Sequence, residues 1–205
     1  MNKNIFKINL LLLSLLSLVV FTSCEEDNVV PEEEHEEEII TDVKLVFTPT
    51  NTLSGLASVE ATAQDPDGEG VQELQVLGSI DLAVNASYTL TYEIMNNEES
   101  PGEDIGEEIS EEADEHQIFY SFTDGAFTSP TGNGNIDNAS DPVNYNDSDS
   151  NGNPIGLSTA WTTGSSLSSG SFTVRLQHQP DVKTSTSTAN TGDTDFELTF
   201  VLNIQ

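Results

Sequence analysis

Short segments of alternating apolar and polar residues recur along this chain, and they constrain its fold more than any other sequence feature. The clearest run from Tyr88 to Ile94, from Phe172 to Leu176 and from Phe196 to Phe200. Such alternation gives a β-strand one apolar and one polar face. Clusters of Gly, Asn, Asp and Ser separate the segments, as turns between strands require. The pattern predicts a mainly β protein with an antiparallel, Ig-like β-sandwich.

Eight strands are expected in all, with one helix between them. The helix is expected within residues 98–115, where Ile105, Ile109 and Ala113 recur every four positions and form one apolar stripe on an otherwise acidic segment. Ser100-Pro101 is its expected start. Two runs rich in Ser, Thr and Gly, 162–171 and 183–194, are expected to be hairpin loops. The expected strands are 39–49, 56–64, 71–77, 87–95, 117–122, 157–163, 171–179 and 195–204.

The N-terminal segment has the pattern of a lipoprotein signal peptide. A positively charged start, with Lys3 and Lys7, precedes an apolar stretch that ends in Thr22-Ser23-Cys24. The apolar stretch is shorter than the roughly 20 residues that span a bilayer, which disfavours the alternative of a transmembrane anchor. We therefore expect residues 1–23 to be removed and Cys24 to carry the lipid that anchors a soluble body to the membrane.

An acidic tether is expected between the anchor and the folded body. Residues 24–38 form this tether from lipidated Cys24, because a run of like charges repels itself and stays extended, and a single β-sandwich domain is expected over 39–205. The alternative for the acidic run is a cation-binding segment centred on Glu34-His35-Glu36. Glu25-Glu26-Asp27 resembles the export signal that sends lipoproteins of Bacteroidetes-type bacteria to the cell surface, which favours the cell exterior as the location.

The charge of the chain limits its partners. The formal net charge is −31, and beyond the predicted signal peptide the only Lys and Arg residues are Lys44, Arg175 and Lys183. Nucleic acid and anionic lipid are excluded as partners, because both are bound through Lys and Arg. Carboxylates between Lys44 and Arg175 require solvent, divalent cations or a basic partner to neutralise them. Because Cys24 is the only cysteine, the folded body has no disulfide.

One loop has the beginning of a calcium-binding motif. Residues 147–153 read D-x-D-x-N-G-N, which directs hard oxygen ligands toward one centre. The twelfth position is Ser158, where an EF-hand has Glu, so a calcium site must take a carboxylate from elsewhere. The alternative is a polar turn of the Asx type. A second acidic loop, 65–70, is more typical of a hairpin turn. The predicted calcium ligands are Asp147, Asp149, Asn151, Asn153 and Asp141.

Two histidines suggest a transition-metal site. Glu112 and His116 are four positions apart, and His178 lies on an expected strand. Imidazole and carboxylate ligands together suit zinc or copper. The alternative is that His116 interacts with the dipole at the end of a helix and that His178 packs at the end of a strand.

Nothing in the sequence indicates catalysis. The chain has no G-x-S-x-G motif, no phosphate-binding loop and almost no cation to stabilise an oxyanion. Glycoside hydrolysis by a pair of carboxylates is a formal alternative, but no pair stands out from the acidic background. We expect a non-enzymatic protein with no catalytic or organic-cofactor residues, and apart from the transition metal suggested above, Ca²⁺ is the one cofactor considered.

Local patterns also resemble a known family. They are the lipoprotein signal, the acidic tether, the segment 97–105, Glu111 to His116, and Arg175 to Pro180. With them the chain resembles small outer-membrane lipoproteins of flavobacteria, often labelled type 1 periplasmic binding fold superfamily proteins. That label implies two α/β lobes with parallel sheets, whereas the alternating segments predict an antiparallel sandwich, which is the architecture we expect.

Three functions are therefore considered. The first is a surface-exposed outer-membrane lipoprotein that binds a ligand, cation or partner and assists an outer-membrane uptake receptor, by analogy with the resembled proteins. The second is a calcium-stabilised structural or adhesive module. The third is an acidic lipoprotein that binds a transition metal. The sequence does not identify a small-molecule ligand.

Overall fold

The computed structural model describes residues 38–50, 55–68, 72–98 and 100–205. The chain divides into two units, Met1–Glu36 and Glu37–Gln205, and the described residues belong to the second. The signal peptide, Cys24 and nearly all of the tether, including Glu34-His35-Glu36, lie outside the described residues and stay predictions. Within the described ranges, no helix has the length and apolar character needed to cross a membrane.

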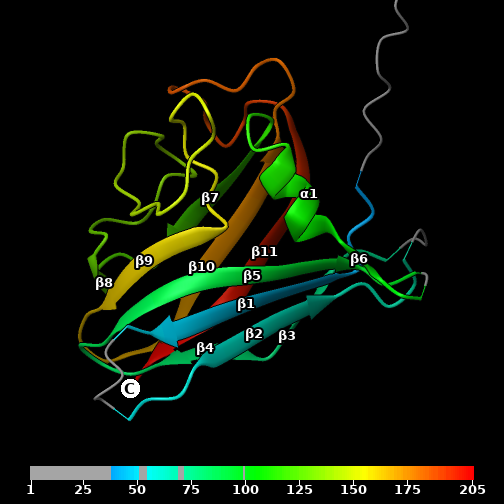
Figure 1. Ribbon diagram of the computed structural model, residues 1–205. Helices are drawn as coiled ribbons and strands as arrows, with labels where there is room; N and C mark the ends of the chain where they lie inside the picture. The colour runs from blue at the N-terminus through cyan, green and yellow to red at the C-terminus, as the bar shows by residue number, and fades with distance from the viewer. Residues whose placement is uncertain (1–37, 51–54, 69–71, 99) are drawn as a thin grey trace, which may run out of the picture. The chain divides into compact units, whose positions relative to one another are not determined.

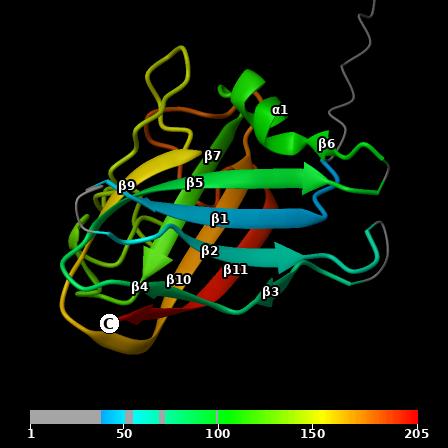
Figure 2. The ribbon, with the colours of Figure 1, turned by 60° about the horizontal axis from the view of Figure 1, so that its bottom comes forward.

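The described unit is a sandwich of two β-sheets with one short helix, which confirms the predicted mainly β fold. Figures 1 and 2 show the strands of one sheet crossing those of the other at a steep angle. The larger sheet has the order β3-β2-β1-β5-β9-β8, with β6 also paired to β5. Its strands are β1 (Asp42–Pro49), β2 (Val59–Gln64), β3 (Gln75–Leu77), β5 (Ser87–Asn96), β6 (Glu103–Asp104), β8 (Phe127–Ser129) and β9 (Ser158–Thr163). The smaller sheet has the order β4-β11-β10-β7, with β4 (Ser79–Leu82), β11 (Asp193–Ile204), β10 (Leu167–His178) and β7 (His116–Phe122).

The core lies between the sheets and is built by the alternation that the sequence shows. Val43, Leu45 and Phe47 all point inward from β1 and are fully buried. Phe172 of β10 lies in an aromatic cluster, with its ring centroid 5.1 Å from that of Trp161 and in edge-to-face geometry. Its ring also contacts those of Phe47, Tyr120 and Phe127.

Several strand predictions need correction. Strand β4 pairs with β11 in parallel, so the smaller sheet is mixed and not purely antiparallel. Strands β4, β6 and β8 have two to four residues each, too few for a period of two to be recognised, and they were not expected. The predicted loop 162–171 is shorter than expected, because β9 continues to Thr163 and β10 begins at Leu167.

The helix α1 (Ile105–Glu111) is present, and Ile105 and Ile109 of the predicted apolar stripe are buried on it, whereas Ala113 lies in the turn after the helix. It begins later than expected. Asp104, and not Ser100-Pro101, is the N-cap, because its side chain accepts a hydrogen bond from the Glu107 amide at 3.2 Å. The helix lies beside the ends of β7 and β10, as both views show (Figures 1 and 2), and this end of the sandwich carries the candidate site.

The long β10–β11 connection lies over the outer face of the smaller sheet. Arg175, on that face of β10, donates a hydrogen bond from its guanidinium group to the carbonyl of Ala189, which is fully buried. Arg175 also forms an ion pair with Glu197 of the neighbouring strand. Phe119, opposite Arg175 in the register of β7 and β10, is buried on the same face. The predicted loop 183–194 is therefore a cover for the sheet as well as a connection.

We expect Phe172→Ala to lower the free energy of unfolding by about 3–5 kcal/mol, because it removes a large side chain from the centre of the aromatic cluster and leaves a cavity. Thr173→Ala, at the next position of the same strand but facing outward, is the matched control and should cost less than about 1 kcal/mol. Urea unfolding followed by the fluorescence of Trp161 measures both. Equal losses for the two variants would contradict this assignment of the core.

Candidate metal centre

Two histidines from different strands meet at one end of the sandwich. His116 is the first residue of β7, His178 is the last residue of β10, and they are direct partners in the antiparallel register of these strands. Their rings stack almost in parallel, with centroids 4.6 Å apart and planes at 4°. The backbone pairing of β7 with β10 therefore sets the separation of the two imidazoles.

The backbone of α1 determines which nitrogen of His116 can act as a ligand. Nδ1 of His116 lies 3.2 Å from the carbonyl oxygen of Glu112, the C-cap residue of the helix. A carbonyl only accepts, so Nδ1 carries the hydrogen, and in the neutral ring the lone pair is on Nε2. Metal-binding histidines in proteins are commonly fixed in this way, with one ring nitrogen bonded to a carbonyl and the other free to ligate.

Glu38 faces that Nε2 atom. Its Oε1 lies 2.8 Å from Nε2 of His116, and the two side chains are 8% and 0% exposed. The contact is short, and the second oxygen of Glu38, Oε2, is buried with no hydrogen-bond partner in the described part of the chain. When His116 is neutral, with its hydrogen on Nδ1, the buried carboxylate and the buried imidazole thus present acceptor atoms to each other.

For both Glu38 and His116, burial shifts the pKa in one direction and the interaction with the partner shifts it in the other. Burial raises the pKa of Glu38, but the short contact with His116 and the charges of His116 and His178 outweigh it, so the net shift is downward. Burial lowers the pKa of His116, but Glu38 outweighs it and the net shift is upward. Both shifts favour a carboxylate anion with a cation beside it.

Two further carboxylates extend the cluster toward solvent. Glu115 lies in the turn before β7, and its Oε2 is 3.5 Å from Nε2 of His178. Glu112 is exposed at the end of α1. Ligand atoms within 4.8 Å of one another form two overlapping groups, Glu38–His116–His178 and Glu112–Glu115–His178. The three residues predicted from the sequence, Glu112, His116 and His178, are therefore all in the cluster, but they are divided between the two groups.

In the predicted calcium loop, the carboxylates of Asp147 and Asp149 accept hydrogen bonds from backbone amides. Oδ1 of Asp149 accepts hydrogen bonds from the amides of Asn151 and Asn153, and Gly152 takes the left-handed conformation, with φ of +85°, that this tight turn needs. The two oxygens of Asp147 accept from the amides of Gly156 and Ser158, each at 2.9 Å. The contacts of Asp149 are those of an Asx-type turn, the alternative considered for this loop, and calcium binding by the loop stays a prediction.

An internal cation lies beside that turn. Nζ of Lys183 is 3.3 Å from Oδ2 of Asp149, and each side chain is 1% exposed. The ammonium group also donates to the carbonyls of Ala113 and His116 at 2.6 and 2.8 Å. Lys183 therefore neutralises the carboxylate on which the calcium prediction depends. Asp141, the fifth predicted calcium ligand, accepts a hydrogen bond from the side chain of Asn138.

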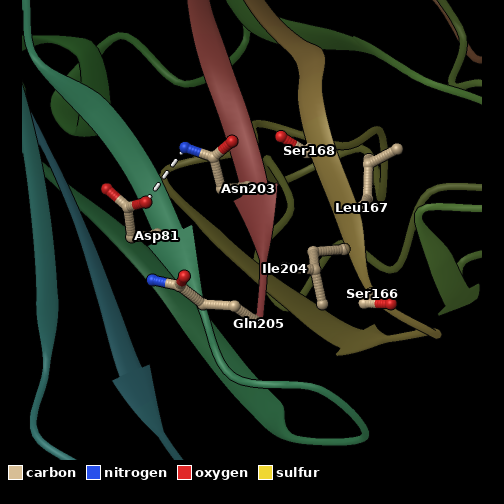
Figure 3. Close-up of a pocket in the computed structure, with 7 residues that line it drawn as sticks. All are labelled: Asp81, Ser166, Leu167, Ser168, Asn203, Ile204 and Gln205. Atoms are coloured by element: carbon tan, nitrogen blue, oxygen red, sulfur yellow. Dashed lines mark hydrogen bonds between the residues drawn. The ribbon is translucent and has the colours of Figure 1, made fainter.

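The described part of the second acidic loop, residues 65–68, forms a turn. Asp65 accepts a hydrogen bond from the amide of Asp67 at 3.0 Å, and the loop joins the antiparallel strands β2 and β3. A pocket of about 490 Å³ adjoins it. Another pocket, of about 510 Å³, lies beside β4 and β11, where Asn203 donates to Asp81 (Figure 3). Neither pocket is lined by a residue of the histidine cluster.

Comparison of the chain with protein-family models, with curated proteins and with solved structures finds no match. The resemblance to flavobacterial lipoproteins accordingly stays a prediction from local sequence patterns. The candidate site rests on its own geometry.

We expect Lys183→Met to lower the free energy of unfolding by about 3–5 kcal/mol, because it leaves the buried carboxylate of Asp149 and two backbone carbonyls without their cation. Lys44→Met is the matched control. The ion pair of Lys44 with Glu93 is solvent-exposed, with 33% and 58% of the two side chains accessible, so its loss should cost less than about 1 kcal/mol. Urea unfolding measures both, and a small loss for Lys183→Met would show that the pair is not buried in solution.

Because the carboxylates of Asp147 and Asp149 are already engaged, we expect calcium to raise the melting temperature no more than magnesium does. Thermal melts of residues 25–205 in EDTA, calcium and magnesium measure this. A calcium-specific rise that disappears in Asp147→Ala/Asp149→Ala would overturn the Asx-turn reading, since a ligand that binds only the folded state must stabilise it.

Proposed function

We propose that this protein is a non-enzymatic, lipid-anchored lipoprotein of the outer membrane whose β-sandwich binds a divalent transition-metal ion at Glu38, His116 and His178. Zinc and copper are the ions that suit two imidazoles and a carboxylate. Of the three functions considered from the sequence, this is the third, and it is also a specific form of the first, in which the bound species is a cation.

One observation carries the proposal: Nε2 of His116 and Oε1 of Glu38 face each other at 2.8 Å in a buried site. With Nδ1 of His116 donating to the Glu112 carbonyl, both facing atoms of the neutral pair are acceptors. Two buried acceptors at this distance repel each other unless they share a cation. The shared cation is either a proton on His116 or a metal ion.

The surroundings favour a metal ion over a proton alone. Oε2 of Glu38 is a second buried acceptor that a single proton on His116 leaves without a partner in the described residues, whereas a metal ion can engage it together with the imidazoles. The stacked rings of His116 and His178 are parallel, and parallel rings cannot direct both in-plane lone pairs at one point. Binding therefore requires one ring to turn, and we assign this turn to His178, whose side chain is 11% exposed whereas that of His116 is 0% exposed.

The role proposed for the bound ion is capture or transport and not catalysis. Neither described pocket adjoins the cluster, so those pockets offer no space for a substrate beside the ion. A lipid on Cys24 would keep the domain at the membrane, where its negative charge concentrates cations near it. We propose display on the cell exterior, with an outer-membrane uptake receptor as the partner that receives the ion.

We expect residues 25–205, which retain the whole compact unit, to bind one zinc or copper ion with loss of binding in Glu38→Gln and in His116→Phe. His116→Phe keeps the size of the ring and its stacking but removes the nitrogen ligand. Titration calorimetry measures binding, and a thermal melt provides a second readout. Zinc at 100 times its dissociation constant stabilises the folded state by about 2.7 kcal/mol, on the order of 5–10 °C in melting temperature for a domain of this size.

His35→Gln is the matched control, because His35 is the histidine of the acidic tether and lies outside the described residues. It should bind as the unaltered chain does. If His35→Gln loses the ion and His116→Phe keeps it, the ion is held by the tether. If the unaltered chain does not bind zinc or copper at all, the pair shares a proton and the proposed function is wrong.

A further inference from the structure

The exposure of the side chains in the histidine cluster increases from the interior to the surface of the domain. His116 is fully buried and Glu38 nearly so, His178 and Glu115 have side chains that are 11% and 25% exposed, and Glu112 is exposed. A hydrated ion in solution therefore meets the carboxylates of Glu112 and Glu115 before it can reach His116. The one residue common to both ligand groups is His178, which lies between them.

We propose that Glu112, Glu115 and His178 form an outer metal position that receives the ion from solvent and passes it, through His178, to the inner position at Glu38 and His116. This inference rests on the proposed function, because it describes how the ion reaches the site proposed there. The outer position is a separate site, with a different ligand set and a different exposure.

The two positions are occupied in turn by one ion. A neutral imidazole has a single nitrogen with a free lone pair, so His178 can ligate at only one position at a time unless it loses its second proton. The stacked arrangement of the rings is consistent with this, since His178 must turn to address either position. A single turn of one side chain then exchanges the Glu112 and Glu115 ligands for Glu38 and His116.

Backbone contacts keep both positions together while the ring turns. The amide of Gln179 donates to the carbonyl of Glu115 at 2.6 Å, which ties the end of β10 to the turn before β7. The amide of Glu115 donates to the carbonyl of Glu112 at 2.9 Å. The ammonium of Lys183 holds the carbonyl of His116. The motion required is confined to side chains.

The test separates the route of the ion from its final binding. Glu112→Gln is the informative variant, because Glu112 belongs only to the outer group, and Glu111→Gln is its matched control, with the same loss of charge one residue away on the same helix. For each chain, zinc uptake is followed after rapid mixing, zinc release is followed in excess chelator at two chelator concentrations, and the dissociation constant is measured by equilibrium competition.

We expect Glu112→Gln to slow uptake and release by the same factor, on the order of tenfold, with an unchanged dissociation constant, because removing a step on the route alters both rates but not the end states. Glu111→Gln should change neither rate. If Glu112→Gln raises the dissociation constant and leaves uptake unchanged, Glu112 is a ligand of the final site. If it changes nothing, or changes the rates only as Glu111→Gln does, the ion takes another route. In these cases the unaltered chain still binds zinc, whereas failure of the proposed function is seen as no binding at all.

Discussion

The buried ammonium group of Lys183 is the interaction on which this end of the sandwich depends. It joins three segments that are distant in sequence: the turn around Asp149, the β10–β11 connection that contains Lys183 itself, and the segment from Ala113 to His116 that leads from α1 into β7. Burial lowers the pKa of Lys183, and the carboxylate of Asp149 opposes that shift without overcoming it. The group must therefore be compensated fully by its acceptors, because an unpaired buried charge is strongly destabilising.

Because the chain has few Lys and Arg residues, the histidines are important for balancing its buried negative charge. In the described residues, each Lys and Arg is already committed: Lys44 to Glu93, Arg175 to Glu197, and Lys183 to Asp149. Among the described residues, His116 and His178 are therefore the groups near the buried carboxylate of Glu38 that can supply positive charge. Imidazoles, unlike ammonium groups, can also act as metal ligands. A carboxylate placed against two imidazoles is a ligand set that suits a transition-metal ion.

The sequence predicted the longer strands because their alternation matches the pleat, and β1, β5 and β11 lie close to where it indicated, whereas β10 begins four residues earlier, at Leu167. It could not predict the parallel pairing of β4 with β11, since four residues carry too little pattern and strand direction depends on tertiary contacts. At the site, the sequence identified His116 and His178 as candidate ligands. It did not predict that they lie opposite each other on neighbouring strands, which follows from the register of β7 with β10. Lys183 carried no local signal, because its partners are set by the folding of loops far from it in sequence.

Glu38 shows most clearly why a site can escape sequence analysis. It is the last residue of an acidic run, where composition alone indicates an extended, solvated tether, yet its side chain is buried against His116. The difference arises because the next residues enter β1, whose pairing with β5 fixes the chain at Thr41 by a hydrogen bond from its amide to the Met95 carbonyl. A cation shared by Glu38 and the two histidines would join the beginning of the domain to β7 and β10. A cross-link that closes a long loop removes more conformational entropy from the unfolded chain than one that closes a short loop. Such an ion would therefore stabilise the whole sandwich as well as occupy a site.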